Sequence, residues 1–218
     1  MSIKSRSKAH TRYYTKDETL VVGVTTVIGL EAKPFLIGWA NNQGLEGIDT
    51  KLFLNATARV GTLAHYLVEC DLTGNKPDLK EYSKEEHQEA LIPFKKFKDW
   101  INEQKDFEPI FTEKGMVSEE HKFGGTIDIL AKVNGKKTLI DLKTSGRIYD
   151  SHKTQLAAYQ KLLEENGHGV EDSRILRIGR GKRGGFEDIR VNNVDLRWQK
   201  FLILLELYNK NKEIKKGG

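Results

Sequence analysis

The sequence predicts an α+β fold, because helical and strand patterns occupy separate blocks along its 218 residues. Apolar residues recur at helical spacing over residues 57–70 and 83–104. Three segments rich in β-branched residues then follow, separated by polar or glycine-bearing turns, at residues 111–117, 123–133 and 137–143. The chain is 38% hydrophobic, so we expect a single domain over residues 1–218 with its own core.

The N-terminal half is predicted to contain one strand and two long helices. Residues 20–30 are rich in β-branched side chains and favour a strand, with Val24 to Thr26 turning into a helix. The helix over residues 57–70 carries His65. Ser83 and the glutamate three residues later form a capping box, which opens a helix that runs to about residue 104. Its buried stripe is predicted to comprise Ala90, Leu91, Phe94, Phe97, Trp100 and Ile101.

The C-terminal half is predicted to add two helices around two short strands. Ser151 is expected to cap a helix that stops at Asn166-Gly167. Residues 174–178 and 186–191 favour strands, and Asp195 opens a last amphipathic helix. The residues of that helix that we expect to be buried are Trp198, Phe201, Leu202, Leu205 and Tyr208.

The most informative segment is a predicted hairpin around Asn134-Gly135, the favoured dipeptide for a two-residue type I′ turn. With that turn, residues pair where their numbers add to 269, so Asp128 and Asp141 face each other. Side chains alternate along a strand, which divides the hairpin into two faces. The face that holds both aspartates is predicted to comprise Thr126, Asp128, Leu130, Leu139, Asp141 and Lys143. The opposite face, predicted to be the core, comprises Ile127, Ile129, Ala131, Ile140 and Leu142.

Two carboxylates held this close favour a metal ion. Directly opposed β-carbons lie about 4.5 to 5.5 Å apart, where like charges destabilise a sheet unless they are neutralised. Carboxylate oxygens suit Mg²⁺ or Mn²⁺ better than zinc, and the single cysteine, Cys70, excludes a multi-cysteine site. Lys143 follows Asp141 on the same face, where its ammonium could reach a water or the charge on an attacked phosphate. An isolated Asp-x-Lys is typical of a solvent-facing strand, but the paired Asp128 favours a hydrolytic site.

Four short motifs occur in order between residues 61 and 159. They are Gly61-Thr62-Leu63-Ala64-His65, Gly125-Thr126-Ile127-Asp128, Asp141-Leu142-Lys143-Thr144-Ser145 and Gln155-Leu156-Ala157-Ala158-Tyr159. With these motifs the sequence resembles the PD-(D/E)xK nuclease superfamily. The resemblance is to its RecB-like branch, which includes phage exonucleases and the mitochondrial genome maintenance exonuclease. It implies a restriction-endonuclease-like α/β/α core, with helices on both sides of a central mixed sheet.

The resemblance also implies roles for individual residues. The metal ligands that it implies are His65, Asp128, Asp141 and the carbonyl of Leu142. Lys143 would orient or activate the water, while Gln155 and Tyr159, one helical turn apart, would contact phosphate or brace Lys143. Glu69 and Glu113 are weaker candidates for a second metal, each also interpretable as a solvated charge.

Positive charge near these motifs indicates where nucleic acid would bind. Lys and Arg exceed Asp and Glu by 36 to 31, a net charge of +5. Within the C-terminal hairpin and helix, residues 174–210, a basic loop interleaves glycines with Arg174, Arg177, Arg180, Lys182 and Arg183. That loop suits phosphates, although a surface hairpin without a ligand would look the same. Closer to the motifs, the residues expected to contact the cleaved strand are Thr144, Ser145, Arg147 and Lys153.

The predicted function is a Mg²⁺- or Mn²⁺-dependent DNA exonuclease for recombination, repair or phage DNA processing. A single-strand or structure-specific endonuclease with the same site, and a non-catalytic DNA-binding module, remain alternatives. The chain has no Walker A sequence, so it would act alone or beside a separate helicase, single-strand-binding protein or annealing protein. No apolar run approaches a membrane span and no secretory signal is recognisable, so a cytoplasmic location in a bacterial or phage-infected cell is expected.

Overall fold

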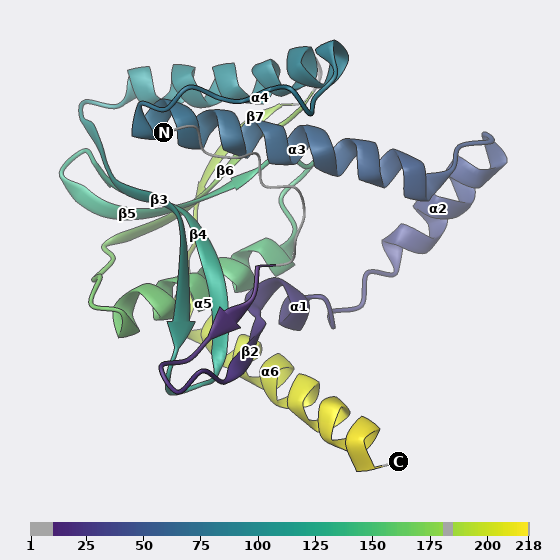
Figure 1. Ribbon diagram of the computed structural model, residues 1–218, viewed down its shortest axis with the longest axis vertical. Coiled ribbons are helices and arrows are strands. Elements are labelled where there is room, and N and C mark those ends of the chain that lie inside the picture. Colours follow the sequence, from purple (N-terminus) through teal and green to yellow (C-terminus); the bar gives the residue numbers. More distant parts are fainter. Residues whose placement is uncertain (1–10, 181–184, 218) are drawn as a thin grey trace.

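The computed structural model describes residues 11–180 and 185–217, and it confirms the predicted α+β fold (Figure 1). The chain begins with β1 (Tyr13–Tyr14), β2 (Leu20–Gly23), α1 (Val24–Ile28), α2 (Phe35–Leu45), α3 (Thr50–Thr73) and α4 (Lys84–Glu103). It continues with β3 (Phe107–Ser118), β4 (Phe123–Val133), β5 (Lys136–Lys143), α5 (Asp150–Glu165), β6 (Asp172–Ile178), β7 (Phe186–Arg190) and α6 (Val194–Gly217). The segment that begins at residue 20 is a strand up to Gly23 and a helix from Val24, as predicted.

The seven strands of the described residues form one mixed sheet with β4 at its centre. One edge of β4 pairs along its length with β3 in antiparallel orientation. Its other edge is divided: β2 pairs in parallel with Phe123 and Gly124, while β5 pairs in antiparallel orientation from Ile129 onward. The sheet then continues through β6, parallel to β5, to β7. Residues 125–128 therefore lie between the two partners of a divided edge.

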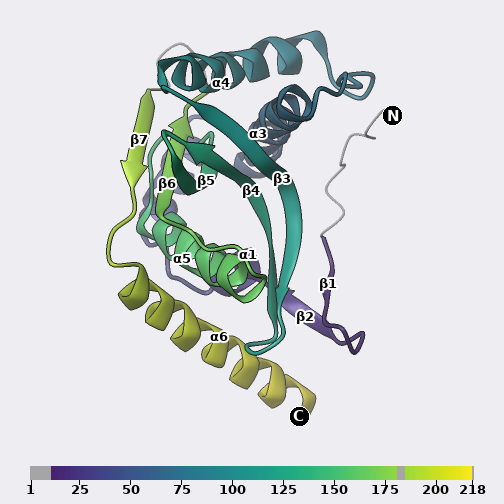
Figure 2. The same cartoon turned by 90° about the vertical axis from the view of Figure 1, so that its left-hand side faces the viewer.

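Helices cover both faces of the sheet (Figure 2). One buried cluster joins α1, α5 and α6 to Leu130 and Leu139, and another joins α3 and α4 to Ile129 and Ile140. The prediction that only one face of the hairpin is core is therefore wrong, since Leu130 and Leu139 are fully buried on the other face. Sheets with helices on both faces bury both sets of side chains, so alternation alone does not identify the core face.

Two helix starts differ from those predicted. The helix of His65 begins at Thr50 rather than near residue 57, because the Asp49 carboxylate accepts hydrogen bonds from the first-turn N–H groups of Lys51 and Leu52. Ser151 does not cap α5, which already begins at Asp150. Tyr149 occupies the cap position instead, and its backbone N–H donates to Nδ1 of His152 at 3.3 Å. The predicted capping box of Ser83 and the stop at Asn166-Gly167 are confirmed.

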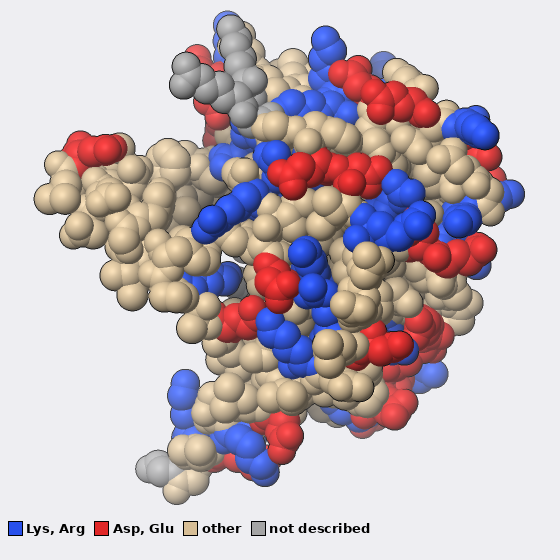
Figure 3. Space-filling model, turned by 180° about the vertical axis from the view of Figure 1, so that it is seen from behind, with Lys and Arg blue, Asp and Glu red and all other residues tan. Residues whose placement is uncertain are grey.

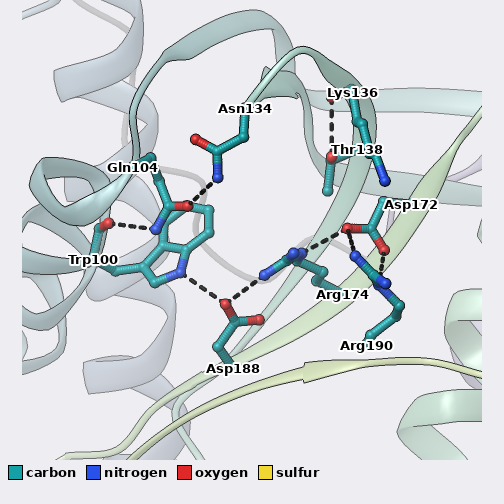
Figure 4. A network of polar contacts seen from close by, with 9 residues as sticks. All are labelled: Trp100, Gln104, Asn134, Lys136, Thr138, Asp172, Arg174, Asp188 and Arg190. Carbon is teal, nitrogen blue, oxygen red and sulfur yellow. Dashed lines mark hydrogen bonds and ion pairs between the residues drawn. The ribbon is translucent and has the colours of Figure 1, made fainter.

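A polar network joins α4 to the far strands of the sheet (Figure 4). Asp188 on β7 accepts hydrogen bonds from the indole of Trp100 at 3.0 Å and from Arg174 at 2.7 Å. Arg174 also donates to Asp172, which in turn binds Arg190. Arg174, part of the basic stretch noted in the sequence, is therefore occupied by two carboxylates of its own sheet.

Within the described residues, no helix combines the length and the apolar character that crossing a bilayer requires.

Candidate active site

The hairpin that carries the two aspartates has the predicted turn and register. Asn134 and Gly135 adopt φ values of 50° and 78°, as a type I′ turn requires. The strands pair from Val133–Lys136 to Ile129–Ile140, which is the predicted register. One position further, the N–H of Leu142 donates to Oδ2 of Asp128 at 2.8 Å. The Asp128 carboxylate is thus fixed against the backbone of β5 at the point where the edge of β4 is divided.

The alternation of β4 is interrupted at Asp128. Ile127 and Leu130 belong to the same buried cluster, although strict alternation would place them on opposite faces. On the neighbouring strand, Glu113 has a φ of 48°, and the register pairs Thr112 with Ile129 and Lys114 with Ile127 on either side of it. Left-handed backbone is uncommon for a residue other than glycine and is often found where a side chain must be redirected. The irregularity coincides with the two residues whose carboxylates approach α3.

Helix α3 supplies the third side chain of this cluster. Nδ1 of His65 lies 3.6 Å from Oε1 of Glu113 and 3.8 Å from Oδ2 of Asp128. One ligand atom from each of the three residues lies within 4.8 Å of the other two. One imidazole nitrogen and two carboxylates, supplied by α3, β3 and β4, therefore converge on a single point.

The positive charge in this cluster is too small to neutralise its carboxylates, and the pKa values of Asp128 and His65 are both raised. Burial raises the pKa of Asp128; His65 counteracts this, but Asp141 and Glu113 add repulsion, and the pKa reaches about 7. Burial alone would lower the pKa of His65, but attraction to Asp128 and to Glu113 outweighs it and raises the pKa to about 9. In the absence of a cation, a proton is therefore retained on each of these groups well above its ordinary pKa.

Asp141 and Lys143 form an ion pair at the end of β5. The Lys143 ammonium lies 2.7 Å from Oδ2 of Asp141 and donates to Oδ1 at 2.9 Å. The Asp141 side chain is only 1% exposed and that of Lys143 is 17% exposed. The lysine is thus held beside the carboxylates while part of its surface still faces solvent.

Helix α5 presents Gln155 and Tyr159 to the same region. The Gln155 amide donates to the Tyr159 hydroxyl at 2.8 Å, and both side chains are buried. Burial raises the pKa of Tyr159 well above 10, and the charges of Asp141 and Asp128 raise it further. Tyr159 therefore remains a neutral hydroxyl close to both aspartates, and the contact seen in the structure is with Gln155.

Two motif glycines are required by close packing. A β-carbon on Gly61 would lie 2.8 Å from Oγ1 of Thr144, and one on Gly125 would lie 2.6 Å from the ring of Tyr159. Glycine at these positions lets α3 approach the end of β5 and lets α5 approach β4. The motif glycines thus set the spacing between the helices and the strands that carry the charged groups.

We expect Gly125→Ala to destabilise the protein by about 1 to 3 kcal/mol, because the new methyl group must displace Tyr159 and Leu162. Urea unfolding would measure this. Gly169→Ala is the matched control, since a β-carbon there meets nothing within 4 Å. Equal stability of the two variants would show that the packing at Gly125 relaxes without cost.

The residues predicted to contact the cleaved strand lie around the start of α5. Ser145 donates its hydroxyl to the carbonyl of Arg147, and the Arg147 guanidinium lies over the rings of Phe35 and Tyr149 at 4.7 and 4.9 Å. Phe35 and Tyr149 are themselves stacked, so α2 is joined to α5 through this arginine. Thr144 lies against Gly61, and Lys153 is half-buried on the first turn of α5. Their contact with nucleic acid stays a prediction.

The described residues of the basic loop make contacts within the protein. Arg177 is buried and lies 2.6 Å from Glu187. The Arg180 guanidinium donates to the carbonyls of Thr144 and Thr57 and so ties the loop to β5 and α3. Lys182 and Arg183 lie outside the described residues. The geometry gives Arg177 and Arg180 a role in holding the strands and helices together, and their predicted contact with phosphate is untested.

Charges of both signs are interspersed on the face seen from behind (Figure 3). The lobe formed by α2 and the start of α3 carries little charge there, in agreement with its exposed apolar side chains. The exposed apolar residues of this lobe include Ile37, Leu45 and Leu52. A basic surface is therefore not what distinguishes this side of the molecule.

Glu113, from the sequence only a weaker candidate for a second metal, is a full member of the cluster. A signal was available in the segment between the two strands. If residues 119–122 form the turn, Ser118 pairs with Phe123, and the same register places Glu113 opposite Asp128. That turn lacks an Asn-Gly dipeptide, so its register was harder to recognise than that of the next hairpin.

The donor set fits a hard divalent cation. His65, Glu113 and Asp128 converge, Asp141 lies close enough to raise the pKa of Asp128, and Lys143 is the cation beside them. Oxygen-rich sites with several carboxylates suit Mg²⁺ or Mn²⁺, and imidazole is also a ligand for Mn²⁺. A metal ion here would relieve the repulsion that otherwise keeps Asp128 protonated near neutral pH.

These shifts predict how stability depends on pH when metal is removed. The folded protein retains protons on Asp128 and His65 above their unfolded pKa values, so the stabilisation is present at low pH. It is lost as pH rises through about 7 for Asp128 and about 9 for His65. We expect the Tm in chelator to fall between pH 5 and pH 9, and Mg²⁺ to oppose the fall because a cation favours the deprotonated groups.

Thermal melts in EDTA and in Mg²⁺ would measure this pH dependence. Asp128→Asn removes one titrating group and should flatten the profile in EDTA. A Tm that rises with pH in EDTA, or a slope unchanged in the variant, would contradict the assignment of these protons.

Comparison with known proteins identifies the family. Residues 45–202 match the family model described as the PD-(D/E)XK nuclease superfamily. Among solved structures, a candidate exonuclease from Eubacterium rectale is similar, with a TM-score of 0.51, 14% identity, and 72% of this chain and 68% of that chain covered. The alkaline exonuclease LHK-Exo of Laribacter hongkongensis matches at 17% identity and a TM-score of 0.35, with 72% and 90% covered.

At these identities the structural matches bear on the fold alone, and no curated protein matches the chain. The family match spans most of the chain and includes all four motifs. The chain therefore belongs to the PD-(D/E)XK nuclease superfamily.

Proposed function

We propose that this chain is a Mg²⁺- or Mn²⁺-dependent DNA exonuclease. The observation that carries the proposal is the convergence of His65, Glu113 and Asp128 beside the Asp141–Lys143 pair. Nucleases of this superfamily use divalent metals, and the order of the four motifs, which resembles that of the RecB-like exonucleases, favours attack at chain ends. His65, Asp128, Asp141 and the carbonyl of Leu142 would hold the cation, as the resemblance implies, with Glu113 as a further ligand.

A bound divalent cation would supply a Lewis acid that stabilises charge on the attacked phosphate and lowers the pKa of the attacking water. The side chains and backbone of the protein would position the water and the metal ligands. Lys143 is held by Asp141 with its ammonium partly facing solvent, where it can hold the water and neutralise charge that develops on the phosphate. The Leu142 N–H fixes the Asp128 carboxylate, and Gln155 and Tyr159 close the side of the site formed by α5.

The decisive experiment is a time course on DNA labelled at either end, offered as linear single strands, linear duplex and circles. Reactions contain Mg²⁺, Mn²⁺ or EDTA. Release of mononucleotides or short oligomers from linear DNA alone, with metal only, is the expected result, and the labelled end released first gives the polarity. Cleavage of circles would replace the exonuclease proposal with an endonuclease. Salt-sensitive DNA binding without cleavage would indicate a non-catalytic module.

The proposed activity suggests the cellular process and the partners of the protein. An exonuclease of this kind would serve recombination, repair or phage DNA processing, with a separate annealing protein, single-strand-binding protein or helicase as its partner. A cytoplasmic location is proposed on the same grounds. Co-purification from cells that express the tagged chain would test the partners.

A further inference from the structure

Helix α6 has two apolar faces, and among residues 11–180 and 185–217 only one of them is packed against other parts of the chain. Phe201 and Leu205 are buried against the core below α5. On the opposite side, apolar side chains remain largely exposed. They are Leu196 at 65%, Ile203 at 68%, Leu207 at 47% and Ile214 at 73% exposed. We call these four residues the outer stripe.

The outer stripe is continuous along the helix. Successive helical residues are about 100° apart, so the four side chains fall within about 40° of one another around the axis. Phe201 and Leu205 lie on the far side of the same helix. The C-terminal half of α6 projects beyond the body of the molecule (Figures 1 and 2), and the residues at the two ends of the stripe, Leu196 and Ile214, are both exposed. Four aligned apolar residues on one free helix face favour packing against another helix.

The spacing of the stripe is symmetric about Leu205. Leu196 and Ile214 lie nine residues before and after it, and Ile203 and Leu207 lie two residues before and after it. Two copies of α6 that cross in antiparallel orientation at Leu205 would therefore match apolar residues throughout: Leu196 against Ile214, and Ile203 against Leu207. A two-fold interface needs this self-complementarity.

A hollow at the N-terminal end of the stripe suits the projecting end of a second copy. It has a volume of about 310 Å³ and is lined in part by Leu196, Ile203 and Lys200. In the antiparallel arrangement, Ile214 of the second copy lies over this hollow. The buried face of each helix points away from the other, so the two bodies lie on opposite sides of the helix pair.

The charges beside the stripe agree with this arrangement. Lys200 and Lys210 lie about 40° to opposite sides of the stripe. In the antiparallel pair, Lys200 lies next to Asn211 of the other copy, and Lys210 lies next to Gln199. Each lysine thus lies beside an amide of the other copy, and within its own copy Lys200 is paired with Glu31 and Asp150 and Lys210 with Glu213, so like charges do not oppose the contact.

We propose that the chain forms a two-fold homodimer through the outer stripe, with its α6 helices antiparallel. Four anchoring residues per copy are fewer than the 20 to 30 of a standard interface, so a dissociation constant in the micromolar range is expected. The proposal does not depend on nuclease activity, and its test does not measure it.

Sedimentation velocity of the full chain at concentrations up to about 200 µM would detect the dimer. Ile203→Glu should raise the dissociation constant at least about tenfold, because it places a charge at the centre of the stripe. Ile37→Glu is the matched control: Ile37 is similarly exposed, at 75% against 68% for Ile203, but lies on α2. A monomer at every concentration would overturn the proposal, and the outer stripe would then be a candidate contact surface for a different protein. Equal weakening by both variants would also overturn it.

A cross-linking experiment tests the orientation. A mixture of Leu196→Cys and Ile214→Cys proteins, oxidised by diamide, should give a mixed disulfide between the two variants. Each variant alone should remain uncrosslinked, since equivalent positions near the helix ends lie far apart in an antiparallel pair. The native Cys70 is buried and serves as the background. Disulfides within each single variant would indicate parallel helices and overturn the arrangement.

Discussion

Lys143→Met is expected to lower the cleavage rate at least about 100-fold while leaving the affinity for DNA within about threefold of the wild type. The reason is geometric. The ammonium is held 2.7 Å from Asp141 at the edge of the carboxylate cluster, where it meets the reacting phosphate and water rather than the length of the DNA. Methionine retains the length of the side chain and removes only the charge. Single-turnover cleavage in Mg²⁺ and fluorescence anisotropy in EDTA would measure the two quantities.

The variant also leaves the Asp141 carboxylate, 1% exposed, without its cation. Breaking a buried ion pair costs about 3 to 5 kcal/mol, so we expect a lower Tm in EDTA, and a smaller loss in Mg²⁺ if the metal replaces the ammonium. Lys136→Met, at the exposed start of the same strand, is the matched control and should change neither quantity. Unaltered cleavage by Lys143→Met would remove the lysine from the proposed chemistry.

Asp128→Asn is expected to weaken Mn²⁺ binding at least about 100-fold and to abolish cleavage, since it removes the carboxylate that lies 3.8 Å from His65 and is fixed by the backbone of β5. The asparagine oxygen can still accept the N–H of Leu142, so the local backbone is retained. Calorimetric titration with Mn²⁺ alone would measure the loss. In EDTA near pH 8 the variant should be at least as stable as the wild type, because repulsion from Asp141 and Glu113 is relieved.

Two further variants test whether Glu113 is also a metal ligand. Glu113→Gln should also weaken Mn²⁺ binding if Glu113 is a ligand, whereas Glu108→Gln, exposed on the same strand, should not. Wild-type Mn²⁺ affinity in Asp128→Asn would refute the proposed metal site. A loss in Asp128→Asn with none in Glu113→Gln would return the ligand set to His65, Asp128, Asp141 and the carbonyl of Leu142.

The hairpin was predictable because its determinants are local. Asn134-Gly135 imposes the turn, the turn fixes the register, and the register brings the two aspartates together. The motif order then led to the family. In the same way, the capping box of Ser83 gave the start of α4, since both of its members lie within one turn of helix.

Features that depend on distant partners were not predictable. The prediction for the basic loop counted positive charges, but Glu187 on the neighbouring strand binds Arg177. The carbonyls of Thr57 on α3 and of Thr144, just after β5, accept hydrogen bonds from Arg180. Helix α2 was missed because none of its residues is buried, so it lacks the apolar period that reveals a packed helix. The alternation of the hairpin did not reveal that both sheet faces are buried, because the helices that cover them come from distant parts of the chain; only the family resemblance implied helices on both sides.

The divided edge of β4 also governs when the site can form as the chain is synthesised. The pairing of β2 with β4 joins residues 22 and 123, and the side chains of the site come from positions 65 to 159. Pairings between such distant segments form slowly, because the intervening chain must first be closed into a loop. A nascent chain that ends before α5 would hold all of its candidate ligands and still expose Gly125 and the core side of β4. We therefore expect the proposed nuclease activity to appear only after α5 has covered the sheet, late in the synthesis of the chain.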